Sequence, residues 1–211
     1  KKNNILFIAD EVICGFGRTG NMWGCQTFDI KPDIVTCAKG LSSAYAPISA
    51  VLMSENIANE VEKQAIKLGQ FGHGYTYSGH PVSSAVALKT LDIMEKRNII
   101  DHVRDVCTIF SKRILKLQKY ECIGNVRSIG LIGAAEFIKP GTKREKIDVV
   151  HKFAATAVKK IHEKGVILRA LPIDAIAFCP PLIITEDEIN QMFDKIESVF
   201  PEMDQIAKGY N

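Results

Sequence analysis

The chain has 211 residues, with 27 Lys and Arg against 24 Asp and Glu, so its formal charge at pH 7 is +3. Hydrophobic residues make up 46% and charged residues 24%, which is typical of a folded protein and excludes a disordered chain. No apolar run approaches the roughly 18 residues of a membrane span, and the small positive charge forms no basic patch for nucleic acid. We therefore expect a folded protein with neither a membrane nor a nucleic-acid partner.

The first half of the chain alternates short apolar runs with glycine-rich loops. Helical periodicity covers residues 54–68, a loop follows over residues 69–81, and a second helix begins at Val82. Alternation of strands with helices predicts an α/β sheet whose functional side chains lie at strand ends. The expected strands are Ile5–Ala9, Asp33–Cys37 and Pro47–Met53.

After a break at Arg97 and Asn98 the pattern is that of an α+β unit. We therefore expect two domains, residues 1–97 and residues 98–211. A helix should follow the break, and Asp148 should cap a later helix that ends at Gly165. The predicted apolar face of that later helix is Val150, Phe153, Ala154, Ala157 and Ile161. The predicted strands of this unit are Gly130–Ile138, Val166–Leu168 and Ala175–Phe178, and a capping box at residues 185–188 predicts a last helix that runs through Phe200.

The cysteine and histidine pattern gives no metal site. Six cysteines are scattered with no C-x-x-C pair, and His73 and His80 have no third ligand nearby in the sequence. We expect reduced thiols and a cytoplasmic location. The sequence starts inside an apolar run without Met, so we expect a longer parent chain, and a mitochondrial location remains open.

The loop at residues 15–20 matches the pattern G-x-G-x-x-G. In a dinucleotide site these glycines follow a strand directly and open a helix, and Asp33 would then bind the ribose. Here residues 10–14 separate the loop from the strand, and residues 21–24 are a poor helix start. The pattern therefore favours a structural loop over a nicotinamide-dependent oxidoreductase.

Two side chains at predicted strand ends have complementary chemistry. Asp10 ends the first strand, and Lys39 follows the second. An amine at such an edge can attack a carbonyl group, and a carboxylate can hold a proton on a pyridine nitrogen. Alternatively, each is an ordinary exposed residue. The loop at residues 73–81 either offers amides and a hydroxyl to a phosphate or packs its aromatic rings on a core.

Several motifs together resemble the class III (ω-amino acid) aminotransferases of PLP fold type I. These motifs are Asp10–Val12, residues 15–20, Pro32–Val35, Ala38–Gly40, His73–Pro81 and Pro180–Ile184. The resemblance covers essentially the whole chain in family order. It implies an α/β fold in which residues 1–97 are the C-terminal part of the large PLP-binding domain, with a mixed sheet. Residues 98–211 would be the small C-terminal α+β domain.

The same resemblance implies a PLP-dependent transaminase that moves an amino group from an ω-amino acid or amine to a keto acid such as pyruvate. Lys39 would form the Schiff base with PLP and transfer the proton, and Asp10 would keep the pyridine nitrogen protonated. The other implied contacts are Val12 on the ring, Thr76 with the Tyr75 amide on the phosphate in the neighbouring subunit of a homodimer, Arg169 on a substrate carboxylate, and Trp23 in the substrate channel.

Family members also have an N-terminal half that this sequence lacks. That half carries the glycine-serine loop for the cofactor phosphate and the aromatic residue that stacks on the ring. The alternative to an active transaminase is therefore a truncated, non-catalytic fragment that acts only as an interaction module.

Overall fold

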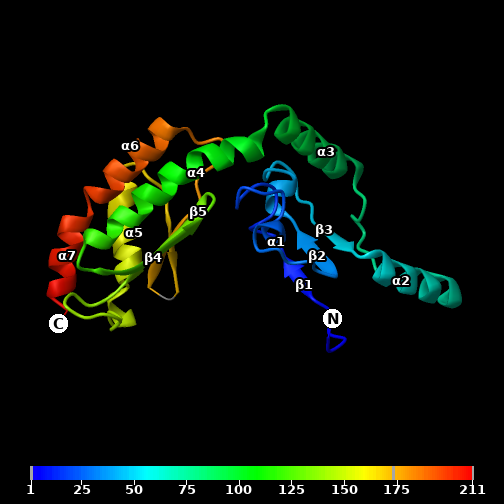
Figure 1. The fold of residues 1–211 in the computed structure, drawn as a ribbon, viewed down its shortest axis with the longest axis horizontal. Helices are drawn as coiled ribbons and strands as arrows, with labels where there is room; N and C mark the ends of the chain where they lie inside the picture. The colour runs from blue at the N-terminus through cyan, green and yellow to red at the C-terminus, as the bar shows by residue number, and fades with distance from the viewer. Residues whose placement is uncertain (1, 173, 211) are drawn as a thin grey trace. The chain divides into compact units, whose positions relative to one another are not determined.

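The computed structural model describes residues 2–172 and 174–210. The chain divides into two compact units, Lys1–Ile100 and Asp101–Asn211, each with its own sheet (Figure 1). Among the described residues, no helix combines the length and the apolar character that crossing a membrane requires.

The first unit is built on a mixed three-stranded sheet in the order β1-β2-β3. Its strands are β1 (Ile8–Asp10), β2 (Ile34–Cys37) and β3 (Ala50–Met53). The central strand β2 runs parallel to β1 and antiparallel to β3. The parallel register places Asp10 beside Thr36, which brings the ends of β1 and β2 to the same edge of the sheet.

The prediction of three strands in this unit is confirmed, but the third, expected at Pro47–Met53, begins only at Ala50, and the bounds of the first are wrong. The strand was expected at Ile5–Ala9 and lies at Ile8–Asp10. Strand pairing starts only where β2 supplies partners: the amides of Asp33 and Ile34 both donate to the Phe7 carbonyl, at 2.8 and 3.2 Å. The apolar residues before this point stay exposed because nothing in the described unit covers them.

Four helical segments complete the first unit: α1 (Gly24–Thr27), the 3₁₀ turn η1 (Lys39–Leu41), α2 (Glu55–Leu68) and α3 (Pro81–Lys96). The prediction of α2 is confirmed, and it ends at Gly69 in the left-handed conformation that glycine adopts easily. The buried core of the unit is small and consists of Phe16, Cys37, Leu41 and Ala87. Large apolar side chains on β1, β3 and α2 are therefore left at the surface.

The second unit has a four-stranded antiparallel sheet in the order β4-β5-β7-β6. Its strands are β4 (Ile123–Ile129), β5 (Ile132–Phe137), β6 (Arg169–Leu171) and β7 (Ala175–Phe178). Helices α4 (Ile99–Leu115), α5 (Phe153–Glu163), α6 (Glu186–Glu197) and α7 (Phe200–Lys208) gather around these strands (Figure 1). The 3₁₀ turn η2 (Lys116–Lys119) follows α4. A large core includes six fully buried phenylalanines: Phe110, Phe137, Phe153, Phe178, Phe193 and Phe200.

Of the three strands predicted in this unit, Ala175–Phe178 is confirmed, Gly130–Ile138 is confirmed with narrower bounds as β5, and Val166–Leu168 is wrong. The strand at Ala175–Phe178 has the predicted bounds. Strand β4 was not predicted; it forms a hairpin with β5 through Gly130, whose φ of 54° lies in the left-handed region. Strand β6 begins at Arg169 rather than at Val166, because its pairing with β7 starts opposite Ala177.

The helix predictions in this unit need two corrections. Asp148 caps only the 3₁₀ turn η3 (Val149–His151), so Val150 is 71% exposed and does not join the core. Helix α5 begins at Phe153 and takes its cap from Asp174, whose Oδ1 accepts a 2.7 Å hydrogen bond from the Ala154 amide. The capping box at Thr185 is confirmed, but the predicted last helix is two helices, α6 and α7.

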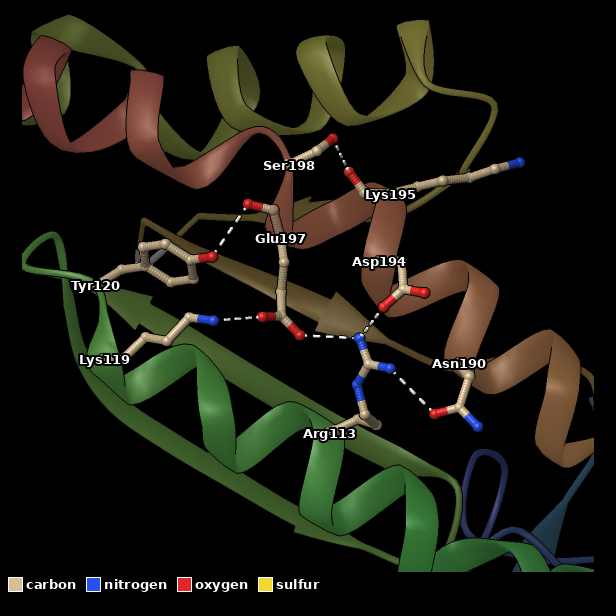
Figure 2. Close-up of polar contacts among 8 residues, drawn as sticks. All are labelled: Arg113, Lys119, Tyr120, Asn190, Asp194, Lys195, Glu197 and Ser198. Carbon is tan, nitrogen blue, oxygen red and sulfur yellow. Dashed lines mark hydrogen bonds and ion pairs between the residues drawn. The ribbon is translucent and has the colours of Figure 1, made fainter.

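A polar network joins α4 to α6 (Figure 2). The Arg113 guanidinium donates to Asn190 at 3.0 Å, to Asp194 at 2.6 Å and to Glu197 at 2.9 Å. Lys119 donates to the second oxygen of Glu197 at 2.6 Å. The network holds the two helices together beside the phenylalanine core.

Candidate active site

Asp10 and Lys39 lie at the same edge of the first sheet. Strand β1 ends at Asp10, and β2 ends at Cys37, two residues before Lys39. Because β1 and β2 are parallel, their carboxyl ends lie side by side, which is where open α/β sheets bind ligands. Both side chains are exposed, so the amine and the carboxylate are accessible to a ligand.

The Asp10 carboxylate is held through one of its two oxygens. Oδ1 accepts hydrogen bonds from the Val12 amide at 3.1 Å and from the Thr36 hydroxyl at 3.2 Å. Within the described residues no hydrogen bond reaches Oδ2, which is therefore available to a further donor. A carboxylate fixed in this way can bind a protonated nitrogen without first reorganising.

Lys39 has a strained backbone. Its φ of 43° lies in the left-handed region, which residues with a side chain rarely adopt. The turn is closed by the Ser42 amide, which donates to the Lys39 carbonyl at 3.3 Å, and the buried Ser42 hydroxyl donates to the Ala46 carbonyl at 2.6 Å. These contacts fix the backbone of the turn that carries Lys39.

The glycine loop at residues 15–20 supports this turn. Phe16 is 3% exposed and packs on Gly40, where a β-carbon would lie only 2.9 Å from the Phe16 Cβ. The loop leads into α1, which has only four residues. Asp33, which would bind a ribose in a dinucleotide site, instead accepts the Phe7 amide at 2.9 Å. The loop is therefore a packing element of the Lys39 turn.

Glu11 is a site residue that the sequence analysis missed. It is 3% exposed, and its two carboxylate oxygens accept the amides of Gly24 at 2.8 Å and Cys25 at 2.5 Å. Its own amide donates to the Thr36 carbonyl at 2.9 Å. Glu11 thus ties the start of α1 to the end of β1. The sequence did carry a signal for Glu11. Successive side chains in extended backbone point to opposite sides, so Glu11 is expected on the side away from Asp10.

Burial and the neighbouring Glu11 carboxylate both change the chemistry of Cys25. Burial raises the pKa of the Cys25 thiol, and the hydrogen bond and negative charge of Glu11 raise it further. Both effects disfavour the thiolate, the reactive form of a cysteine.

Val12 and Trp23 are both half-buried. In the sequence, Val12 directly follows Glu11 and Trp23 directly precedes α1. The rings of Trp23 and Phe16 pack with centroids 5.0 Å apart at an interplanar angle of 58°. The Trp23 amide donates to the Gln26 side chain at 3.0 Å. Trp23 is therefore fixed on the loop that supports Lys39.

The loop that carries Tyr75 and Thr76 is fully exposed. It folds on itself, since the Tyr75 amide donates to the Ser78 hydroxyl and the Ser78 amide donates to the Tyr75 carbonyl, both at 2.9 Å. Within the described part of the chain, no hydrogen bond or ring contact joins this loop to Asp10 or Lys39. The loop therefore presents its aromatic side chains and the Thr76 hydroxyl to the outside of the unit.

Arg169 belongs to the second unit. It is the first residue of β6, opposite Ala177 of β7, and its side chain is exposed. Residues 2–172 and 174–210 contain no group of three or more His, Cys, Asp or Glu side chains that could hold a metal ion.

Comparison with known proteins identifies relatives over almost the whole chain. The sequence model described as "Aminotransferase class-III" matches residues 1–200. An uncharacterised aminotransferase of Sinorhizobium fredii is 41% identical over 211 residues, which is 99% of this chain and 45% of the relative. A probable γ-aminobutyrate transaminase 3, mitochondrial, of Oryza sativa subsp. indica is 43% identical over 195 residues, or 92% of this chain and 38% of the relative.

Solved structures agree with the sequence relatives. A chain described as "Transaminase with L-ala" superposes with a TM-score of 0.93 at 42% identity, covering 97% of this chain and 48% of the other. The ω-transaminase from Pseudomonas jessenii in complex with PMP superposes with a TM-score of 0.92 at 37% identity, covering 98% and 45%. The predicted fold class, PLP-transferase fold type I, is confirmed. The chain spans less than half the length of these relatives.

Proposed function

The chain belongs to the class-III aminotransferases, and we propose that it provides the lysine-bearing side of the PLP site of a transaminase. The observation that carries the proposal is the placement of Lys39 and Asp10 at the ends of two adjacent parallel strands. The alternative of a non-catalytic interaction module gains no support from the comparisons, because the relatives are described as transaminases.

The donor set at this edge fits PLP. An aldehyde needs a primary amine, which Lys39 offers, and a pyridine nitrogen needs a carboxylate, which Asp10 offers through its available Oδ2. When bound, PLP supplies an aldehyde for amine exchange and a protonated ring that takes up electron density from the substrate.

We assign to Lys39 the covalent attachment of the cofactor and the movement of a proton at the substrate carbon. An amine that is displaced by the incoming substrate amine stays close to the reacting carbon and can act there as base and then as acid. The strained turn at Lys39 and the packing of the next residue, Gly40, on Phe16 would hold the lysine in place for this role. Asp10 stabilises the positive charge on the ring nitrogen through a charge-assisted hydrogen bond.

The remaining predicted site residues are proposed to orient the cofactor and substrate. Val12 would pack on the ring and Trp23 would line the substrate channel. Arg169 would bind a substrate carboxylate, for which its planar guanidinium suits two parallel hydrogen bonds. Tyr75 and Thr76 would bind the phosphate of the neighbouring subunit's cofactor in a homodimer, which is supported by the outward exposure of their loop.

We propose an ω-amino acid or amine as the amino donor and a keto acid such as pyruvate as the acceptor. The names of two relatives support these classes: one is a probable transaminase of γ-aminobutyrate, an ω-amino acid, and one structure contains L-alanine, the amino acid that pyruvate gives. We also propose a cytoplasmic location, which the lack of a disulfide among the described residues supports. The rice relative, in contrast, is described as mitochondrial.

Borohydride reduction tests the proposal, because it converts a lysine–PLP bond into a stable amine. The native protein that carries this chain should gain a phosphopyridoxyl group that peptide mapping places on Lys39. The Lys39→Ala variant should lose both the label and transamination, whereas Lys67→Ala, at an exposed lysine near the end of α2, should keep both. A label elsewhere, or an active Lys39→Ala variant, would refute the proposal.

A further inference from the structure

Thr36 is held on both sides beside the candidate site. It lies on the central strand β2, opposite Asp10 on β1 and opposite Val51 on β3. The Glu11 amide also donates to the Thr36 carbonyl at 2.9 Å, which extends the pairing by one residue past the end of β1. The backbone of Thr36 is therefore fixed from both sides.

The Thr36 side chain contacts the carboxylate that the proposed function assigns to the cofactor ring. Its hydroxyl lies 3.2 Å from Asp10 Oδ1 and must be the donor, because an ionised carboxylate only accepts. The rotation of a β-branched side chain about χ1 is restricted, so the hydroxyl keeps its direction. Together with the Val12 amide, at 3.1 Å from the same oxygen, the hydroxyl fixes the rotation of the carboxylate plane.

We propose that Thr36 is a positioning residue: its hydroxyl occupies Asp10 Oδ1 so that Oδ2 is presented to the protonated ring nitrogen of the bound cofactor. This inference rests on the proposed function. It assigns Thr36 no contact with substrate or cofactor, and Thr36 acts only through Asp10. Without the hydroxyl, only the Val12 amide would hold the Asp10 carboxylate. The carboxylate could then rotate, so that either oxygen could face the ring nitrogen.

The test compares cofactor binding among variants of the native protein, with PLP itself as the probe. Thr36→Val keeps the shape and the β-branching but removes the hydroxyl. We expect its Kd for PLP to rise roughly threefold to tenfold, the change that loss of one hydrogen bond produces. We also expect the pH midpoint of the visible absorbance of the bound cofactor to rise, because a ring nitrogen that holds its proton less firmly withdraws less electron density from the lysine–PLP bond. Thr90→Val is the matched control, since among the described residues the Thr90 hydroxyl bonds only the Val86 carbonyl of its own helix.

A second pair of variants isolates the hydroxyl if Thr36→Val folds poorly. Thr36→Ser and Thr36→Ala both lose the methyl group, and only the serine keeps the donor. Serine should stay closer to the wild-type Kd and absorbance midpoint than alanine, although its unbranched side chain holds the hydroxyl less firmly. Equal values for Thr36→Val and Thr90→Val, or for serine and alanine, would overturn the inference. Failure of the proposed function is recognised separately, by a Lys39→Ala variant that keeps its borohydride-fixed label or its activity.

Discussion

Arg113 on α4 and Glu197 on α6 form a 2.9 Å ion pair in which the two side chains are only 13% and 16% exposed. Figure 2 shows that the pair lies between Lys119 and Asp194, which extend it on either side. Burial raises the pKa of the Glu197 carboxyl, but hydrogen bonds from Lys119 and Arg113 outweigh this and hold it below its ordinary value. The pair therefore stabilises the packing of α4 on α6.

Glu197→Gln should lower the free energy of unfolding by roughly 2 kcal/mol, because the Arg113 guanidinium would stay largely buried with a weaker partner. Asp194→Asn is the matched control. Asp194 accepts from the same guanidinium nitrogen but is 72% exposed, so we expect a loss below roughly 0.5 kcal/mol. Urea denaturation followed by circular dichroism measures both. Equal losses would show that burial does not decide the strength of these pairs.

The same carboxylate should make stability fall in acid. Since the pKa of Glu197 is lower in the folded than in the unfolded state, its contribution is complete above the ordinary carboxyl pKa and is lost as the pH falls through the folded value. Unfolding free energies between neutral and acid pH should therefore decrease less steeply for Glu197→Gln than for the wild type. If the unfolding free energies of the two proteins fell in parallel with pH, Glu197 would not be the cause of the acid sensitivity.

Asp174 should give the free energy of unfolding the opposite pH dependence. Burial raises its pKa, the Ala154 amide opposes the shift, and its Oδ2 has no hydrogen-bond partner within the described residues. Its contribution to stability is complete below the ordinary carboxyl pKa and is lost as the pH rises through the folded value. Asp174→Asn should remove this dependence and, because asparagine tolerates the φ of 54°, stay within roughly 1 kcal/mol of the wild type at pH 7. Asp174→Ala should lose roughly 1–2 kcal/mol of helix capping. Thermal melting across pH measures all three proteins.

The fold could be predicted where local chemistry determines the element. The Thr185 capping box, the Gly69 helix end and the apolar strand Ala175–Phe178 all lie where the sequence places them. The failures have tertiary causes. Asp174 caps α5 from twenty residues beyond Ala154, so Asp148 was the wrong cap. No local signal marks such a distant partner.

The candidate site could be predicted in part, because its reactive groups follow strand ends. Parallel pairing of two predicted strands was enough to bring Asp10 and Lys39 to one edge. The supporting residues could not be found in this way. Glu11 and Thr36 contribute through contacts with Gly24, Cys25 and Asp10 that depend on register and on loop packing.

The Glu11 carboxylate should be detectable through the reactivity of Cys25. Burial is the first cause of the raised thiol pKa, but the hydrogen bond and charge of Glu11 add to it. Glu11→Gln removes the charge, so the pH midpoint for alkylation of Cys25 should fall toward that of an ordinary cysteine. Iodoacetamide labelling across pH, read by peptide mass, measures this midpoint. The exposed Cys179 is the internal control and should react as before. A Cys25 midpoint that stays or rises would mean that burial alone sets the pKa.

Gly40 tests whether the glycine loop supports the reactive lysine. In Gly40→Ala the new methyl group would lie 2.9 Å from the Phe16 Cβ, an atom close to the backbone that cannot swing away. Either Phe16 leaves the small core or the turn at Lys39 moves. We expect a loss of about 1–3 kcal/mol in stability, as for overpacked cores, and a lower fraction of protein that borohydride fixes with PLP.

Gly72→Ala provides the matched control in the same unit, because nothing lies within 4 Å of the position of its new β-carbon. Its stability should be unchanged or slightly higher, by up to about 1 kcal/mol, since alanine restricts the unfolded chain. If Gly40→Ala retained full labelling while losing stability, the loop would stabilise the unit without orienting Lys39. Loss of labelling only in Gly40→Ala would show that the contact between Phe16 and Gly40 positions the amine.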